Sequence, residues 1–91
     1  MHTLLDNYPN PFNPSTSITF GLSNSTPAKI IIFNLVGQKI KAFDLKNLRA
    51  GFYTIKWDGT DFDGQAVSAG MYFFQLQTPD LIKTKRMVLL K

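Results

Sequence analysis

The chain has 91 residues, no cysteine and a formal net charge of +4. The missing cysteine excludes disulfide bonds, thiol nucleophiles and thiolate metal ligands, and no apolar run approaches the ~20 residues of a membrane-spanning helix. The length fits one domain, and a hydrophobic content of 44% favours a packed core over a disordered chain.

The first distinctive segment is NYPNPFNPST, residues 7–16, which places three prolines within six residues. Proline lacks the N–H that a helix interior or a central strand needs, and it makes the preceding residue extended. We therefore expect a turning or polyproline-like segment, with Tyr8 and Phe12 capping the open end of a β-sandwich. Residues 1–6 are expected to be a linker or an introduced tail, with His2 in its frayed end.

Apolar and polar residues alternate with a period of two through most of the remaining chain, and no window has the capped periodicity of a helix. Turn-forming residues interrupt these runs at intervals of about ten residues, which is typical of an antiparallel sandwich. The sequence therefore predicts six or seven short strands, two of which form a hairpin over residues 28–43. The expected strands are 18–22, 28–33, 38–43, 51–57, 70–77 and 82–90, with a link at 44–50 and a short piece at 65–68.

The same alternation assigns the residues at the centre of the sandwich. Trp57 could instead stack on a sugar ring, but its alternation with Tyr53 and Ile55 favours the core. The predicted central residues are Ile18, Phe20, Ile30, Ile32, Tyr53, Ile55, Trp57, Tyr72, Phe74 and Leu76.

The loop DGTDFDG, residues 58–64, is the strongest candidate for a metal site, because its three carboxylates could ligate calcium. Its spacing does not fit an EF-hand loop. With Gly64 on the invariant glycine, Gly59 falls on the first ligand position and Gly70 on the last. The alternative is a pair of Asx-type turns joining two strands. We therefore expect the aspartates to shape turns and to bind no metal.

No catalytic set is recognisable in the sequence. His2 is the only histidine, and a nucleophilic triad would need it in a packed cleft. No carboxylate pair stands out for acid–base catalysis. We therefore expect no enzyme activity and no cofactor.

Two features outside the expected core concern partners. Four apolar residues, Ile31, Phe33, Met71 and Phe73, lie opposite the expected core residues of their strands. They indicate that part of the outer surface is covered, and the cover could come from the N-terminal segment, from another protein or from a tighter internal packing. The last expected strand is rich in basic residues, either as a solvated edge or as a docking patch for an acidic partner. No nucleic-acid-reading pattern of basic and aromatic residues accompanies them. The basic residues are Lys83, Lys85, Arg86 and Lys91.

Four stretches together resemble one family. They are NYPNPFNPST, IIIFNLVGQKI, AGFYTIKWDGTDFDGQAVSAGMYFFQLQT and KRMVLLK, in this order from Asn7 to Lys91. They resemble the type A C-terminal sorting domain of type IX secretion substrates, which is similar to the immunoglobulin-like domain of the flagellar hook-capping protein. The resemblance implies an immunoglobulin-like antiparallel β-sandwich over residues 7–91, at the end of a larger secreted protein of the Bacteroidetes or their relatives.

The resemblance also implies a function. The domain is read in the periplasm by the type IX outer-membrane translocon, and sortase-like components remove it from many cargoes, which then attach to the cell surface. Alone it is expected to be a monomer with no membrane span and no nucleic-acid partner. The alternatives are an interaction or carbohydrate-binding module of a secreted hydrolase, and a hook-capping domain, against which the terminal motif argues. The implied structural positions are Pro9, Pro11, Phe12, Pro14, Gly51, Trp57, Asp58, Gly59, Asp61, Gly64, Gly70 and Tyr72.

The implied sorting signal is the terminal strand. One of its faces must stay in the sandwich, and the other can meet a partner. The sequence leaves open whether Arg86, Val88 and Leu90 or Lys85, Met87 and Leu89 are presented. As an edge strand, it is expected to be available for pairing. The residues of the implied signal are Lys85, Arg86, Met87, Val88, Leu89, Leu90 and Lys91.

Overall fold

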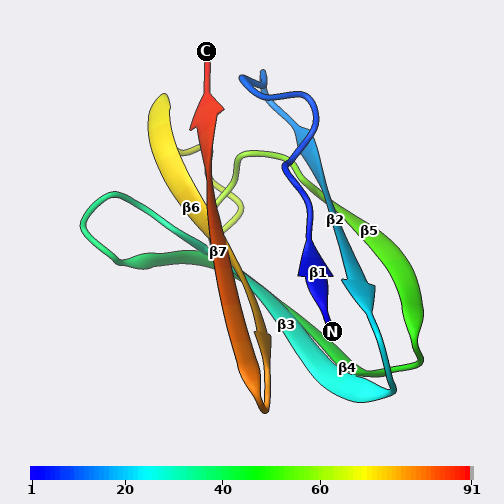
Figure 1. Cartoon of the computed structure of the whole chain (residues 1–91). Coiled ribbons are helices and arrows are strands. Elements are labelled where there is room, and N and C mark those ends of the chain that lie inside the picture. The colour runs from blue at the N-terminus through cyan, green and yellow to red at the C-terminus, as the bar shows by residue number, and fades with distance from the viewer. Residues whose placement is uncertain (91) are drawn as a thin grey trace.

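The computed structural model describes residues 1–90, which form seven strands in two antiparallel sheets and no helix (Figure 1). The three-stranded sheet has the order β1-β2-β5, and the four-stranded sheet has the order β4-β3-β6-β7. The two sheets enclose one core, which confirms the all-β, immunoglobulin-like sandwich. The described part of the chain has no helix that could cross a membrane. The strands are β1 (Thr3–Leu4), β2 (Thr16–Leu22), β3 (Thr26–Phe33), β4 (Lys39–Leu48), β5 (Gly51–Trp57), β6 (Gly70–Thr78) and β7 (Leu81–Leu89).

The predicted hairpin forms from β3 and β4, but β4 is longer than expected. The two strands pair on either side of a turn in which Gly37 has a φ of +84°. The expected link at 44–50 is wrong for residues 44–48, because β4 continues to Leu48. Leu45 and Leu48 pack against the core there. The pairing of β3 with β4 has two register shifts. At such a shift the strict alternation of inward and outward side chains along the strand is interrupted.

The first residues belong to the fold, contrary to the prediction of a linker with a frayed end. Thr3 and Leu4 form β1 and pair with β2. The Leu4 side chain is buried, and the buried His2 ring accepts a hydrogen bond at Nδ1 from the Ser23 N–H (3.1 Å). The physical reason is that β2 would otherwise be an edge strand. Its backbone groups on the side away from β5 need hydrogen-bond partners. Thr3 and Leu4 supply them at Gly21 and Phe20, and the backbone groups of Leu5 and Tyr8 supply them at Thr19 and Ser17.

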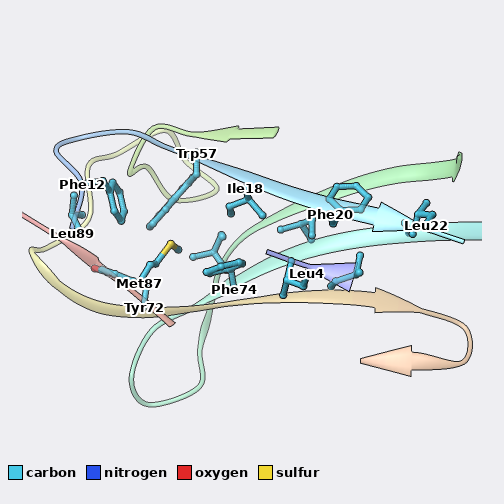
Figure 2. Close-up of a cluster of buried hydrophobic side chains, with 14 residues drawn as sticks. Leu4, Phe12, Ile18, Phe20, Leu22, Trp57, Tyr72, Phe74, Met87 and Leu89 are labelled. Atoms are coloured by element: carbon cyan, nitrogen blue, oxygen red, sulfur yellow. The ribbon is translucent and has the colours of Figure 1, made fainter. Parts of the chain in front are cut away.

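One core lies between the sheets (Figure 2). The central residues predicted from the alternation are buried, except that Tyr53 and Ile55 are only partly buried because β5 is an edge strand. Phe12 and Leu89, from opposite ends of the chain, lie beside Trp57 at one end of the cluster in Figure 2. The termini add to the core the side chains of Leu4, Phe12, Met87 and Leu89.

Candidate functional site

The terminal strand β7 turns one face to the core and the other to solvent. Met87 and Leu89 are 0% and 2% exposed, so a partner cannot contact their side chains while the domain is folded. Arg86 is exposed, Val88 is half-buried, and Leu90 just beyond the strand is 50% exposed. Of the two faces that the sequence left open, the one with Arg86, Val88 and Leu90 is therefore the accessible one.

The basic residues of the strand differ in their surroundings. The Nζ atom of Lys85 lies 3.1 Å from Oδ1 of Asp6, in an ion pair on the surface. Within residues 1–90, Arg86 has no carboxylate at ion-pairing distance. Lys91, the last residue of the implied signal, lies outside the described residues. Arg86 is therefore the described cation of this strand that is best placed to meet an acidic partner.

The proline-rich segment, residues 7–16, pairs with the end of β7. Phe12 and Leu89 form an isolated parallel bridge. The Phe12 N–H donates to the carbonyl oxygen of Val88 (3.0 Å), and the Leu90 N–H donates to the carbonyl oxygen of Phe12 (2.8 Å). Oδ1 of Asn10 accepts a hydrogen bond from the Val88 N–H (3.1 Å). The expectation of an available edge is therefore wrong at Val88 and Leu90, whose backbone groups already have partners.

Side-chain hydrogen bonds hold the proline-rich segment in shape. Nδ2 of Asn7 donates to the carbonyl oxygen of Pro9 (3.1 Å) and to Oγ1 of Thr16 (3.0 Å), and the Thr16 hydroxyl donates to the same carbonyl (2.8 Å). The segment follows the turning alternative, with bends at residues 9–11 and 13–14. The predicted capping role is confirmed for Phe12, which is 1% exposed, and is wrong for Tyr8, which is 81% exposed.

Sequence reasoning missed Asp6 and Asn10, which both contact β7 through their side chains. Each lies far from β7 along the chain, and such a contact leaves no local pattern in the sequence. The one available signal was Asn10 between two prolines, because asparagine side chains commonly bond to backbone groups in turns. That signal does not indicate which backbone group is bonded.

The aspartate-rich loop closes with Asx-type turns, as predicted. Oδ1 of Asp58 accepts hydrogen bonds from the hydroxyl and the N–H of Thr60, and the hydroxyl bond lowers the pKa of Asp58 below its usual value. Oδ1 of Asp61 accepts from the N–H groups of Asp63 (2.9 Å) and Gln65 (3.0 Å). Within residues 1–90, no group of three histidine, aspartate or glutamate side chains lies close enough together to hold a metal ion. The carboxylates of Asp58 and Asp61 thus stabilise the backbone of their own loop.

The loop glycines that the resemblance names all have positive φ angles. At Gly59 the φ angle is +77°, and an added Cβ would lie 2.9 Å from the carbonyl oxygen of Pro14. A side chain at this position would push the loop away from the proline-rich segment. The φ angles of Gly51, Gly64 and Gly70 are +145°, +78° and +143°.

Trp57 lies in the core, so the sugar-stacking alternative is wrong. The ring is 0% exposed, and its Nε1–H donates to the carbonyl oxygen of Thr60 (2.9 Å). Tyr72 packs edge-on against it, with ring centroids 5.5 Å apart. The Tyr72 hydroxyl donates to the carbonyl oxygen of Ser68 (2.6 Å), and burial raises the pKa of this phenol.

The apolar residues on the outer face of the four-stranded sheet are covered only in part. Ile31 is 3% exposed between its cross-strand neighbours, whereas Phe33, Met71 and Phe73 are half-buried. The N-terminal segment runs beside β2 and β7, so the first of the three alternatives, cover by this segment, is wrong (Figure 1). Tight packing therefore explains Ile31, and the other three side chains remain partly accessible.

The comparison with known families agrees with this architecture. Residues 7–80 match the FlgD Ig-like domain family. The chain belongs to this family. The matched residues include β2 to β6 and stop before β7 begins, so the KRMVLLK stretch lies beyond the match. Among curated protein sequences, none matches the chain.

Three solved structures share the fold of this FlgD Ig-like domain. Latent PorU from Porphyromonas gingivalis has a TM-score of 0.80 and 18% identity, over 99% of this chain and 9% of PorU. PorZ from the same organism has a TM-score of 0.69 and 19% identity, over 97% of this chain and 11% of PorZ. FlgD from P. aeruginosa has a TM-score of 0.66 and 22% identity, over 96% of this chain and 63% of FlgD. The chain thus spans about a tenth of PorU and PorZ, and these identities establish a common fold.

Proposed function

We propose that this chain is a non-catalytic sorting domain that directs a larger parent protein through the type IX secretion system and across the outer membrane. The observation that carries the proposal is the two-sided character of β7. Met87 and Leu89 anchor the strand in the core, while Arg86 and Val88 face outward. A receptor can therefore contact the strand without unfolding the domain. The likeness in fold to PorZ, an essential surface component of the type IX system, supports the proposal.

In this proposal the signal is carried by residues 85–91 and is read in the periplasm by the outer-membrane translocon. Sortase-like components then remove the domain or attach the cargo, which reaches the outer-membrane surface or the medium. Arg86 favours an acidic receptor, because complementary charge speeds encounter and selects partners. The buried residues of β7 act indirectly, since they fix the direction in which Arg86 and Val88 point.

Export of a fused reporter tests the proposal. A periplasmic reporter that carries this chain at its C-terminus should reach the surface of a host with a type IX system. Removal of residues 87–91 should abolish export. The triple variant K85Q/R86Q/K91Q should fold and export poorly, whereas the control K46Q/R49Q/K56Q, which loses the same charge elsewhere, should export normally.

Two outcomes would contradict the proposal. Normal export after removal of residues 87–91 would show that the signal does not need the end of β7 and the residues after it. A wild-type fusion that stays in the periplasm and binds surface polysaccharide would support the accessory-module alternative instead. Normal export of the triple variant alone would reject only the role of the charges.

A further inference from the structure

A row of four residues crosses the outer face of the four-stranded sheet. Lys39 of β4 pairs with Phe33 of β3, Phe33 pairs with Phe73 of β6, and Phe73 pairs with Arg86 of β7. Directly paired residues project from the same face of a sheet. Both phenylalanines lie opposite the core, because Ile32 next to Phe33, and Tyr72 and Phe74 on either side of Phe73, are buried in it. The row thus places two aromatic rings between one cation at each edge of the sheet.

A groove of about 270 Å³ lies over the aromatic part of this row, beside the turn that joins β3 to β4. Leu35 and Val36 in that turn are 64% and 79% exposed, which extends the apolar surface beyond the sheet. None of the residues that line the groove is acidic. These residues are Phe33, Asn34, Leu35, Gly37, Phe73, Gln75 and Thr84.

We propose that this face binds an extended protein segment that carries an apolar side chain between two carboxylates. Neighbouring strands are ~4.8 Å apart, so the three steps from Lys39 to Arg86 span about 14 Å. In an extended segment, residues i and i+4 are about 13 Å apart and point the same way, with residue i+2 between them. Carboxylates at i and i+4 can therefore meet Lys39 and Arg86, while the side chain at i+2 enters the groove.

This inference rests on the proposed function in one respect: the receptor that contacts Arg86 and Val88 supplies the segment. Val88 lies opposite Met71, in the row next to Phe73 and Arg86. The outward side of β7 is therefore continuous with the aromatic groove. The receptor therefore contacts a surface formed by all four strands of this sheet, with β7 at one edge.

Charge argues against a second copy of the chain as the occupant. The chain has a net charge of +4, and the row has a cation at each end. Two copies that met through this face would bring these cations together with no carboxylate from either groove to offset them. An acidic segment instead combines opposite charge with burial of its central apolar side chain.

The test follows the amide NMR signals of the 91-residue chain during titration with the capped peptide Asp-Ser-Phe-Ser-Asp. Signals of Phe33, Phe73, Thr84 and Arg86 should move, and binding should weaken at high salt. The double variant K39Q/R86Q should bind about 10-fold more weakly, since two exposed ion pairs are lost. The control R49Q/K56Q, with the same net charge, should stay within about 2-fold of the wild type.

Several results would overturn the inference. The inference fails if these signals do not move or if only signals of the other sheet move. It also fails if Lys-Ser-Phe-Ser-Lys binds as tightly as the acidic peptide, or if R49Q/K56Q loses as much affinity as K39Q/R86Q. Signals that move with protein concentration alone would identify a self-association face, and signals that move only with phosphatidylglycerol vesicles would identify a lipid-binding face. If K39Q/R86Q blocks export although no peptide binds, the sorting proposal stands and this inference fails. If the peptide binds but the wild-type fusion is not exported, the inference of a peptide-binding face stands and the sorting proposal fails.

Discussion

Phe12 and Leu89 form a parallel bridge between the two ends of the chain, and both side chains are buried. The Phe12 ring lies 5.7 Å from the ring of Trp57, centroid to centroid. Through Phe12 the proline-rich segment contributes to the core, and it covers the end of the sandwich where β7 finishes. The segment that joins β1 to β2 thus also stabilises the strand that we propose as the signal.

Phe12→Ala should lower the free energy of unfolding by about 3–5 kcal/mol, because it removes a fully buried aromatic ring and leaves a cavity. Domains commonly have only about 5–15 kcal/mol in total, so the variant should be close to its unfolding threshold. Denaturant unfolding measures the change. Tyr8→Ala, which alters an 81% exposed ring in the same segment, should change it by less than about 0.5 kcal/mol. Equal effects of the two changes would contradict the capping role of Phe12.

The alternation of apolar residues was enough to predict most of the sandwich, because strands with one buried face must alternate. It predicted the central strands and the burial of Trp57, Tyr72 and Phe74. It failed where burial is incomplete or where the strand is very short. Residues 44–48 lie in an edge strand with many exposed positions, and Thr3–Leu4 is too short to show any period.

For the candidate site, the sequence could predict the residues of the terminal strand but not how they are arranged. The sequence indicated a basic terminal strand, and the structure decided which of its faces is accessible. The sequence could not show that Asn10 and Phe12 occupy its edge, because parallel pairing between distant segments has no local signature. The outer row from Lys39 to Arg86 depends on the register of four strands, and this register includes a shift next to Phe33.

The two faces of β7 should respond differently to substitution. Met87→Ala should cost about 2–5 kcal/mol of stability, because the side chain is 0% exposed. Arg86→Gln should change stability by less than about 0.5 kcal/mol, because the side chain is exposed and has no ion pair within residues 1–90. Thermal and denaturant unfolding measure both effects. A large loss of stability in the Arg86 variant would show that this side chain holds the fold together.

Calcium should not stabilise the domain. The carboxylates of Asp58 and Asp61 already accept hydrogen bonds within their loop. A ligand raises the melting temperature only if it binds the native state. Addition of millimolar calcium to chelator-treated protein should therefore leave the melting temperature unchanged in a thermal scan. A rise of several degrees, lost again in Asp61→Asn, would demonstrate a calcium site.

Tyr72→Phe should cost about 0.5–1.5 kcal/mol at neutral pH, because the carbonyl oxygen of Ser68 loses its donor. Burial raises the pKa of Tyr72 in the folded state above the usual value near 10. The stabilisation by the neutral phenol is thus fully present below about pH 10 and is lost as the pH rises through the folded pKa. Unfolding measured from neutral to alkaline pH should therefore show the wild type losing its advantage over Tyr72→Phe. A difference in unfolding free energy between the two proteins that stays constant with pH would contradict this. Tyr8→Phe, which alters an exposed tyrosine, is the control and should show no such pH-dependent difference.

The hydrogen bond from the Val88 N–H to Asn10 can be tested by amide hydrogen exchange. In the wild type, the amides of Val88 and Leu90 should be protected, because Oδ1 of Asn10 and the carbonyl oxygen of Phe12 accept from them. Asn10→Ala removes only the first acceptor, so exchange at Val88 should speed up by about 2- to 10-fold, corresponding to about 0.5–1.5 kcal/mol. Leu90 should stay protected because its acceptor is a backbone group.

Asn13→Ala serves as the control for this measurement, since Asn13 is an exposed asparagine of the same segment. It should leave the exchange of Val88 unchanged. If Asn10→Ala speeds exchange at Val88 and Leu90 equally, the two bonds open together, and the side chain of Asn10 is needed for the whole contact between the segment and β7. If neither rate changes, the side chain of Asn10 does not protect the strand, and the burial and the backbone hydrogen bonds of Phe12 hold the segment against β7.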